Sequence, residues 1–289
     1  MFDVTVLGSA NLDLVVRTER HPSPGETVLG DDFAEYPGGK GLNQAVAAAR
    51  AGASTSFVGA IGTDDAGRTL RSVAEIEGID LSQLVDRDNV PTGRALITVD
   101  HHGENSIVVV PGANATVVAP ASISALVVLC QLEVPLDAVT NAFRAGRARG
   151  ATTILNPAPA IQLPIELLRL CDIVVPNEHE VGLLGGVEAL FDAGVATVVT
   201  TRGEQGIEIH TAAGEQHQIP APHVPVVDTT GAGDTFCGAL SARLAHGASI
   251  TDAAEWAVAA SALAVGLPGA IPSIPDAGAT RRLLDQLSS

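Results

Sequence analysis

Short apolar runs alternate with helical patterns in the second half of the chain, and this alternation limits the fold more than any other feature. The runs occupy residues 125–129, 152–155 and 173–175, with helical patterns at 136–149 and 164–170 between them. Strands that alternate with helices build a mostly parallel sheet with helices on both faces. We therefore expect an α/β fold, a three-layer αβα sandwich with a mostly parallel central sheet.

Polar residues follow these apolar runs, at the strand ends where α/β proteins bind ligands. Glu133, Asn177 and Glu180 occupy such positions. Each of them could simply cap a helix, and it is their convergence on one sheet edge that favours a site. Glu180 lies three residues after Asn177, on the same helical face, where an acid can hold a water or Mg²⁺.

Other parts of the chain depart from this regular alternation. Short strands without helices between them are expected at 14–17, 27–33, 95–99 and 106–110. They predict a small β-sheet that projects from the α/β body. His101 and His102 lie at a hairpin tip and could indicate a metal site, although polar turn residues are the simpler interpretation. The remaining expected elements are strands at 4–7, 55–60 and 196–200, a hairpin at 207–209 and 217–219, and helices at 66–77, 252–265 and 276–287, with at most two very short helices in 182–193.

Charge and cysteine usage narrow the possible partners and the compartment. The chain has 33 acidic and 16 basic residues, a net charge of −17, which argues against nucleic acid or an anionic membrane as partner. No apolar run approaches the roughly 18 residues of a membrane span, and no signal peptide is visible. Three cysteines lie far apart, as expected for buried, reduced thiols in a cytoplasmic protein.

A glycine-rich turn at residues 228–234 follows the apolar run 224–227 and opens a helical pattern. A strand, a glycine turn and a helix together aim unpaired backbone N–H groups at an anion, and the helix dipole adds positive charge there. Asp228 and Asp234 flank this turn, so one of them could be a general base or a cation ligand. These residues alone are explained equally well by a turn in which Asp234 caps the helix.

A second glycine-rich segment, residues 37–44, runs into a helix expected at 45–51. Its glycines would let the backbone approach a ligand closely, with Asn43 in the first helical turn. A flexible loop is the alternative, and the spacing is not that of a Walker A loop. Asn11 and Asp13 follow the first strand, where they could bind sugar hydroxyls or form a turn.

Taken together, the segments 38–44 and 228–234, with Asn11, Asp13, Glu133 and the run 177–180, resemble the ribokinase-like (PfkB) family of carbohydrate kinases over nearly the whole chain. The resemblance implies one domain, residues 1–289, with a β-sheet lid drawn from about 14–36 and 93–112. It implies transfer of the γ-phosphoryl group of ATP to the O5 hydroxyl of D-ribose, with Mg²⁺ and K⁺ as further cofactors. It also implies a homodimer formed through the lid.

The resemblance also implies roles for individual residues. Asp234 would be the catalytic base, and the N–H groups of Gly231, Ala232 and Gly233 would form an anion hole. The positions that match sugar-binding residues are Asn11, Asp13, Gly39, Lys40, Gly41, Asn43, Glu133 and Asp234. The positions that match nucleotide-binding residues are Asn177, Thr201, Gly203, Glu204, Gly206, Gly233 and Val258. Glu180 would belong to the Mg²⁺ shell, and the K⁺ ligands would be Asp228, Thr230, Ala264, Leu267, Gly269 and Ser273.

Two departures from the family pattern and several alternatives stay open. Leu42 stands where alanine is expected, and the segment after Glu180 is shorter than usual by about a helix, which could trim the cover of the sheet near the nucleotide.

Within the family, 2-deoxyribose, a nucleoside or a ketose could replace ribose as substrate. A non-catalytic sugar-binding relative is the alternative of another class, and the presence of Asp234 argues against it. A dinucleotide-dependent oxidoreductase is discounted because the first strand lacks the required glycine turn.

Overall fold

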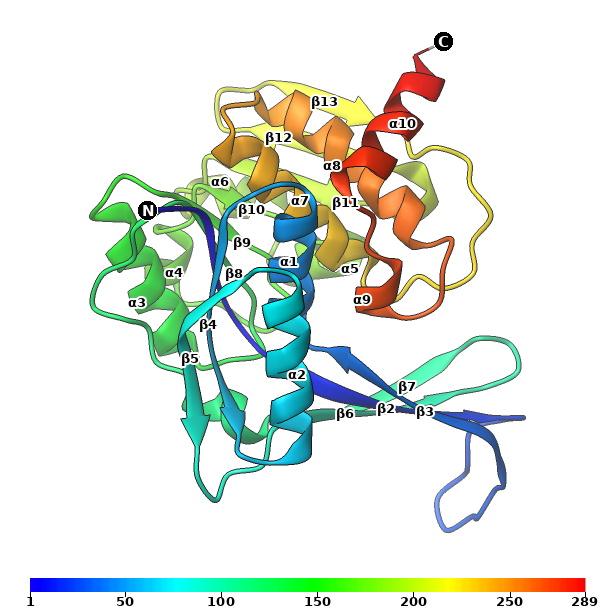
Figure 1. Cartoon of the computed structure of the whole chain (residues 1–289). Helices are drawn as coiled ribbons and strands as arrows, with labels where there is room; N and C mark the ends of the chain where they lie inside the picture. The colour runs from blue at the N-terminus through cyan, green and yellow to red at the C-terminus, as the bar shows by residue number, and fades with distance from the viewer. Residues whose placement is uncertain (289) are drawn as a thin grey trace.

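A nine-stranded sheet runs through the centre of the protein in the computed structural model, which describes residues 1–288 (Figure 1). In spatial order its strands are β13 (Gln216–Ile219), β12 (Ile207–Thr211), β11 (Thr197–Thr201), β10 (Ile173–Val174), β9 (Thr152–Leu155), β8 (Ala125–Cys130), β1 (Phe2–Leu7), β4 (Thr55–Gly62) and β5 (Asp80–Arg87). The seven strands from β11 to β5 are parallel, and β12 and β13 add an antiparallel hairpin at one end. The predicted mostly parallel sheet is confirmed.

Helices cover both faces of this sheet, because alternate strand residues point to opposite sides. In β8, Val127 and Leu129 belong to one hydrophobic core, and Val128 and Cys130 belong to the other. The first core contacts α1 (Lys40–Arg50), α2 (Asp65–Ile76), α7 (Ala232–Ala245), α8 (Ile250–Ala264), α9 (Ala270–Ser273) and α10 (Ala277–Leu287). The second core contacts α3 (Leu136–Arg147), α4 (Ile165–Leu168), α5 (Glu178–Leu183) and α6 (Val187–Asp192), so the three-layer αβα sandwich is confirmed.

A second, four-stranded sheet projects from the body at the lower right of Figure 1. Its strand order is β3 (Gly30–Gly38), β2 (Asn11–Thr18), β6 (Gly93–Val99) and β7 (Asn105–Val110). The pair β2 and β6 is parallel, and the outer pairs are antiparallel. This projecting sheet is the one expected from the short strands. One of those strands differs in its bounds: a strand was expected at 27–33, whereas β3 extends from Gly30 to Gly38 and pairs with β2 over that length.

Three other expectations differ from the structure. Strand β5 was not predicted; it forms one edge of the main sheet and half of its residues are exposed. The apolar run at 224–227 is not a strand: Val226 and Val227 are 65% and 62% exposed, and both line a cavity. Helix α1 begins at Lys40 rather than at residue 45. In residues 1–288 no helix is both long and apolar enough to cross a membrane.

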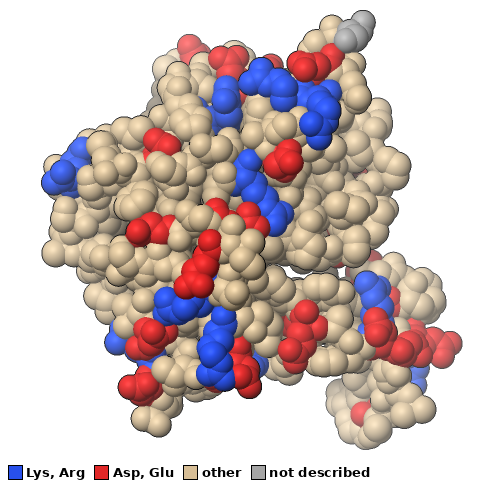
Figure 2. All heavy atoms as spheres, in the orientation of Figure 1, with Lys and Arg blue, Asp and Glu red and all other residues tan. Residues whose placement is uncertain are grey.

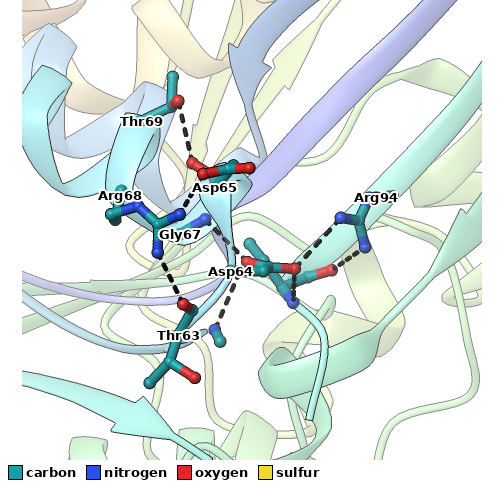
Figure 3. Close-up of polar contacts among 9 residues, drawn as sticks. Thr63, Asp64, Asp65, Gly67, Arg68, Thr69 and Arg94 are labelled. Carbon is teal, nitrogen blue, oxygen red and sulfur yellow. Dashed lines mark hydrogen bonds and ion pairs between the residues drawn. The ribbon is translucent and has the colours of Figure 1, made fainter. Parts of the chain in front are cut away.

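Asp64 ties the projecting sheet to the body (Figure 3). It is the N-cap of α2, where its carboxylate accepts from the Gly67 backbone N–H at 3.0 Å. The same carboxylate accepts from the N–H and the hydroxyl of Thr92 and pairs with Arg94 of β6 at 3.1 Å. Burial alone would raise the pKa of Asp64, but the hydrogen bonds from Thr92 and Gly67 lower it to about 2. One ionised carboxylate therefore joins the first turn of α2 to the beginning of β6.

We expect Asp64→Ala to lower the free energy of unfolding by about 1–3 kcal/mol, because it removes a helix cap and leaves the Thr92 donors unpaired. The shift of the urea unfolding midpoint measures this loss. Asp65→Ala is the matched control, since the Asp65 side chain is 96% exposed and pairs only with Arg68. Its effect should stay within about 0.5 kcal/mol. If Asp64→Ala and Asp65→Ala lowered the free energy of unfolding equally, Asp64 would not anchor the projecting sheet to the body.

Candidate active site

Asp234 lies in the first turn of α7, and its carboxylate is held by two amides from α1. The side chain is 7% exposed. Its Oδ2 accepts from Asn43 Nδ2 at 2.9 Å, and its Oδ1 accepts from Gln44 Nε2 at 2.8 Å. The helix-cap interpretation therefore does not describe this residue, because its hydrogen bonds go to another helix and not to its own first turn.

The turn before Asp234 depends on glycine. Gly231 is the N-cap of α7 and has φ of 76°, in the left-handed region that favours glycine. A Cβ on Gly231 would lie 2.8 Å from the Cβ of Ala270, so the turn packs directly on the segment that follows α8. Of the three N–H groups expected to form an anion hole, that of Ala232 donates to the Thr229 carbonyl at 3.2 Å. Gly231 and Gly233 line a cavity beside Asp234.

Three adjoining cavities meet around this turn, and Thr229 lines all of them. The outer cavity, about 510 Å³, is lined by Thr201, Gly203, Glu204, Gly206, Gly233 and Val258, six of the seven predicted nucleotide-binding residues. The central cavity, about 220 Å³, is lined by Lys40, Asn177, Glu180, Gly231, Gly233 and Asp234. The sheet cavity, about 330 Å³, lies between the projecting sheet and the body and is lined by Asp13, Tyr36, Asp228, Thr230 and Gly269.

Figure 2 shows the projecting sheet standing away from the body at the lower right, with a hollow between them. Acidic and basic side chains are interspersed on this face and form no continuous basic stripe.

The predicted sugar-binding residues lie where β1, β2 and α1 come together. Asn11 opens β2, and its Oδ1 accepts from Asn114 Nδ2 at 2.7 Å. Asn114 is completely buried and also bonds both the N–H and the carbonyl of Ala10, at 3.0 and 3.2 Å. Asn114 thus fixes the residue at the root of the projecting sheet. Sequence reasoning missed it, and the only local signal was an asparagine in a short loop after a strand.

Glu133 and the glycines of α1 hold the beginning of that helix. Glu133 Oε2 accepts from the Ser9 hydroxyl at 2.5 Å and from the Lys40 N–H at 3.2 Å. A Cβ on Gly41 would lie 2.5 Å from the Ser9 nitrogen, and one on Gly39 would lie 2.7 Å from the Asn11 nitrogen. These glycines were expected to admit a ligand. In the structure both positions also lie against the protein's own backbone, which lets α1 begin directly against residues 8–11. Their contact with a sugar stays a prediction.

Charges of both signs are crowded around Lys40, the only lysine of the chain. Burial alone would lower the pKa of Lys40, but the carboxylates of Asp234, Glu133 and Glu180 raise it, so the ammonium stays charged. Burial, with the charges of Glu133 and Asp234, raises the pKa of Asp13 to about 7. Burial also raises the pKa of Glu180, against an opposing hydrogen bond from Asn177. One buried cation therefore offsets several carboxylates.

Asn177 and Glu180 form a reciprocal capping box at the beginning of α5. Asn177 Oδ1 accepts from the Glu180 N–H, and Glu180 Oε2 accepts from the Asn177 N–H, each at 2.8 Å. The helix-cap interpretation is therefore correct for both residues. Both also line the central cavity, so the cap holds them at its wall.

The residues predicted to bind K⁺ come from two adjoining segments. Asp228 accepts from the N–H groups of Thr230 at 2.9 Å and Gly269 at 2.8 Å. Burial alone would raise the pKa of Asp228, but these hydrogen bonds lower it. Of the other predicted ligands, Ala264 is the last residue of α8, Leu267 lies in the loop that follows it, and Ser273 is the last residue of α9. An ionised carboxylate beside a loop of backbone carbonyls is a set of hard oxygen donors that suits such a cation.

Residues 1–288 contain no group of three or more His, Cys, Asp or Glu side chains placed to hold a metal ion. The rings of His101 and His102 lie 3.6 Å apart at the hairpin tip of the projecting sheet. His101 contacts the carbonyl of Glu19, as a turn residue does.

Residues 1–277 match the model of the pfkB family carbohydrate kinases. The chain belongs to this family. It is 41% identical over 293 residues to a ribokinase of Staphylococcus aureus (strain COL), covering 94% of this chain and 96% of that protein. It is 33% identical over 295 residues to a deoxyribokinase of Salmonella typhi, covering 94% and 95%. The solved structure of Arabidopsis thaliana ribokinase complexed with ribose and ATP superposes with a TM-score of 0.87 at 34% identity, covering 98% of each chain.

Proposed function

We propose that this pfkB-family kinase transfers the γ-phosphoryl group of ATP to the O5 hydroxyl of D-ribose, giving D-ribose 5-phosphate. The observation that carries the proposal is the carboxylate of Asp234, buried and held by two amides at the helix terminus where three cavities meet. The similarity to ribokinases over nearly the full chain supports the same activity.

In the proposed reaction Asp234 accepts the proton of the sugar hydroxyl as its oxygen attacks the γ-phosphorus. A new O5–P bond forms, the bond from the γ-phosphorus to the bridging oxygen breaks, and ADP leaves. Such a transfer needs positioning and charge neutralisation more than covalent help. The N–H groups of Gly231 and Gly233, the α7 dipole and the Lys40 ammonium are placed to offset the phosphate charge.

The outer cavity suits a nucleotide. Val258, Val226 and Val265 give it an apolar wall for a base, while Thr201 and Gly203 face it near the central cavity. Mg²⁺ accompanying ATP would neutralise charge on the phosphates. Glu180 fits a place in its water shell, because this acid is held at the wall of the central cavity by the capping box.

The sugar would lie between the sheet cavity and Asp234. Asn43 donates to Asp234, and its own Oδ1 is buried without a hydrogen-bond partner among residues 1–288. A sugar hydroxyl would satisfy that oxygen. Asp13 enters the same region from β2, so the projecting sheet would act as a lid that keeps water away from the phosphoryl group.

A substrate panel tests the activity. With ATP and Mg²⁺, D-ribose should give ADP and a sugar one phosphate heavier, and kcat/KM for D-ribose should exceed that for 2-deoxyribose, nucleosides and ketoses. A pocket that hydrogen-bonds a hydroxyl rejects the analogue that lacks it, which is the expected basis for preferring ribose. A higher kcat/KM for 2-deoxyribose would assign the enzyme to that sugar. Sugar binding without ADP release across the panel would favour a non-catalytic protein.

The kcat/KM for D-ribose should depend on the ionisation of Asp13. Burial, with the charges of Glu133 and Asp234, raises the pKa of this carboxyl to about 7. An ionised carboxylate accepts hydrogen bonds from sugar hydroxyls better than a neutral one, so kcat/KM for ribose should rise between about pH 6 and about pH 8. The measurement is kcat/KM for ribose against pH at saturating ATP. In Asp13→Asn, which is neutral at every pH, this limb should flatten. An unaltered limb in that variant would assign the titration to another group.

K⁺ as an activating ion is part of the proposal. Asp228 and the loop after α8 offer oxygen donors, and Gly231 connects this region to the helix terminus beside Asp234. Replacing KCl with NaCl at constant ionic strength should slow turnover in the wild type, and Asp228→Asn should lose that response. Equal rates in both salts would remove the cation from the mechanism.

We also propose a homodimer formed through the outer face of the projecting sheet, in a cytoplasmic protein whose buried free thiols suit a reducing compartment. Val15, Ile97 and Ile107 line the sheet cavity, so their alternating neighbours form the opposite, outer face. Exposed apolar residues gather on that face: Phe33, Leu96, Val108 and Val110. Exposed apolar patches of this kind mark interfaces. Sedimentation velocity would show whether the protein is a dimer.

A further inference from the structure

We propose that Gln44 is a positioning residue, which holds the carboxylate of Asp234 in its reacting orientation through a buried relay of amide side chains. The inference rests on the proposed function, in which Asp234 is the base. It concerns a residue whose side chain lines none of the three cavities, and which therefore acts through Asp234 rather than on a substrate.

The relay joins four segments that are distant in sequence. Gln44, 0% exposed in α1, donates from Nε2 to Asp234 Oδ1 at 2.8 Å and to Asn156 Oδ1 at 3.1 Å. Its Oε1 accepts from Gln131 Nε2 at 2.5 Å. Gln131 follows β8 and Asn156 follows β9. The base at the beginning of α7 is thereby connected to two strand ends of the main sheet.

Each amide in the relay has one possible orientation. An ionised carboxylate only accepts hydrogen bonds, so Gln44 must direct its NH₂ group at Asp234 and its oxygen at Gln131. Gln131 must then donate. Asn156 Nδ2 donates to the Val175 carbonyl at 3.0 Å, which leaves the Asn156 oxygen to accept the second hydrogen of Gln44. These directions apply when Asp234 is ionised, the state in which it can take a proton, and of the relay's amide atoms the Gln131 oxygen is buried without a hydrogen-bond partner among residues 1–288.

Asn43 and Gln44 hold different oxygens of the same carboxylate and should have different kinetic roles. Asn43 belongs to the proposed sugar site, so its removal would disturb sugar binding together with the base. Gln44 has no cavity-lining surface, so its removal should disturb the direction of the base alone. The distinguishing expectation is a loss in kcat with KM for ribose nearly unchanged.

Gln44→Met tests this, since methionine has a similar length and no donor. We expect kcat to fall roughly 10- to 100-fold, as misplacement of a catalytic group does, with KM for ribose and ATP within about threefold of wild type. Gln83→Met makes the same change at an exposed position of β5 and should leave kcat unchanged.

A double-mutant cycle separates positioning from general structural damage. In the Asp234→Asn background, Gln44→Met should cause little further loss of the residual rate, because its effect passes through the base. A further loss as large as in the wild-type background would overturn the inference, and so would a wild-type kcat in Gln44→Met. An inactive wild-type protein would instead reject the proposed function itself.

If Gln44→Met does not fold, Gln131→Met tests the same inference. It leaves the Gln44 donor in place and removes only the Gln131 Nε2 donor, which orients the Gln44 amide. We then expect kcat to fall roughly 3- to 10-fold, with KM for ribose unchanged. A Gln131→Met enzyme with wild-type kcat would overturn the proposed relay.

Discussion

Replacing Asp234 with asparagine should lower kcat by roughly 100- to 10,000-fold, the usual contribution of a general base, while ribose should still bind. The amide is almost the same size as the carboxylate, but it cannot take up the proton of the sugar hydroxyl. Steady-state kinetics with ribose and ATP measure the loss, and calorimetric titration with ribose measures the retained binding.

The control for Asp234→Asn is Asp252→Asn. Asp252 occupies the same first-turn position in α8, where it is exposed and pairs with the Ser249 N-cap. Its replacement should leave kcat within about twofold of wild type, because it lies away from the three cavities. Residual activity of Asp234→Asn above about a tenth of wild type would refute the assignment of Asp234 as base.

Placing a methyl group on Gly231 should have the second largest effect. In Gly231→Ala the new Cβ would lie 2.8 Å from that of Ala270, so either the α7 terminus or the loop after α8 must move. Both the N–H groups of the turn and Asp234, three residues later, would be misdirected. We expect kcat to fall by roughly 100-fold or more, with an additional cost of about 1–2 kcal/mol for a left-handed alanine.

Gly25→Ala separates these two contributions to the Gly231 effect. Gly25 has φ of 81°, but a Cβ there meets no atom within 4 Å. Its replacement should therefore cost similar stability in urea unfolding while kcat stays at the wild-type value. If Gly231→Ala retained wild-type kcat, the packing of the turn on Ala270 would have no part in catalysis.

The main sheet could be predicted because parallel strands buried on both faces appear in the sequence as apolar runs of a length distinct from helices. Strand β5 escaped prediction for the same reason, since an edge strand with exposed residues lacks such a run. The apolar run at 224–227 gave the opposite error, since it predicted a strand that the structure does not contain. Val224 and Val226 line a cavity beside α8 instead of joining a sheet, and local sequence does not distinguish these two uses of apolar residues.

The site was predictable to the extent that its residues follow strands or open helices, as Asp234, Asn177 and Asp13 do. Its internal connections were not. Gln44 and Asp234 are separated by 190 residues, and Asn114 and Asn11 by 103, so neither contact leaves a local pattern. The packing of Gly39 and Gly41 against residues 8–11 was also hidden, because close approach of neighbouring backbone leaves no local pattern in the sequence.

The sheet cavity has a consequence for how movement of this protein could be observed. Tyr36, the only tyrosine of the chain, lines that cavity from β3, opposite Gly269 on the body. The only tryptophan, Trp256, is buried in α8 beneath Arg243 and Arg281. One chromophore therefore belongs to the projecting sheet and the other to the body. Ultraviolet spectra of the unlabelled wild-type chain can consequently follow the sheet separately from the rest of the molecule.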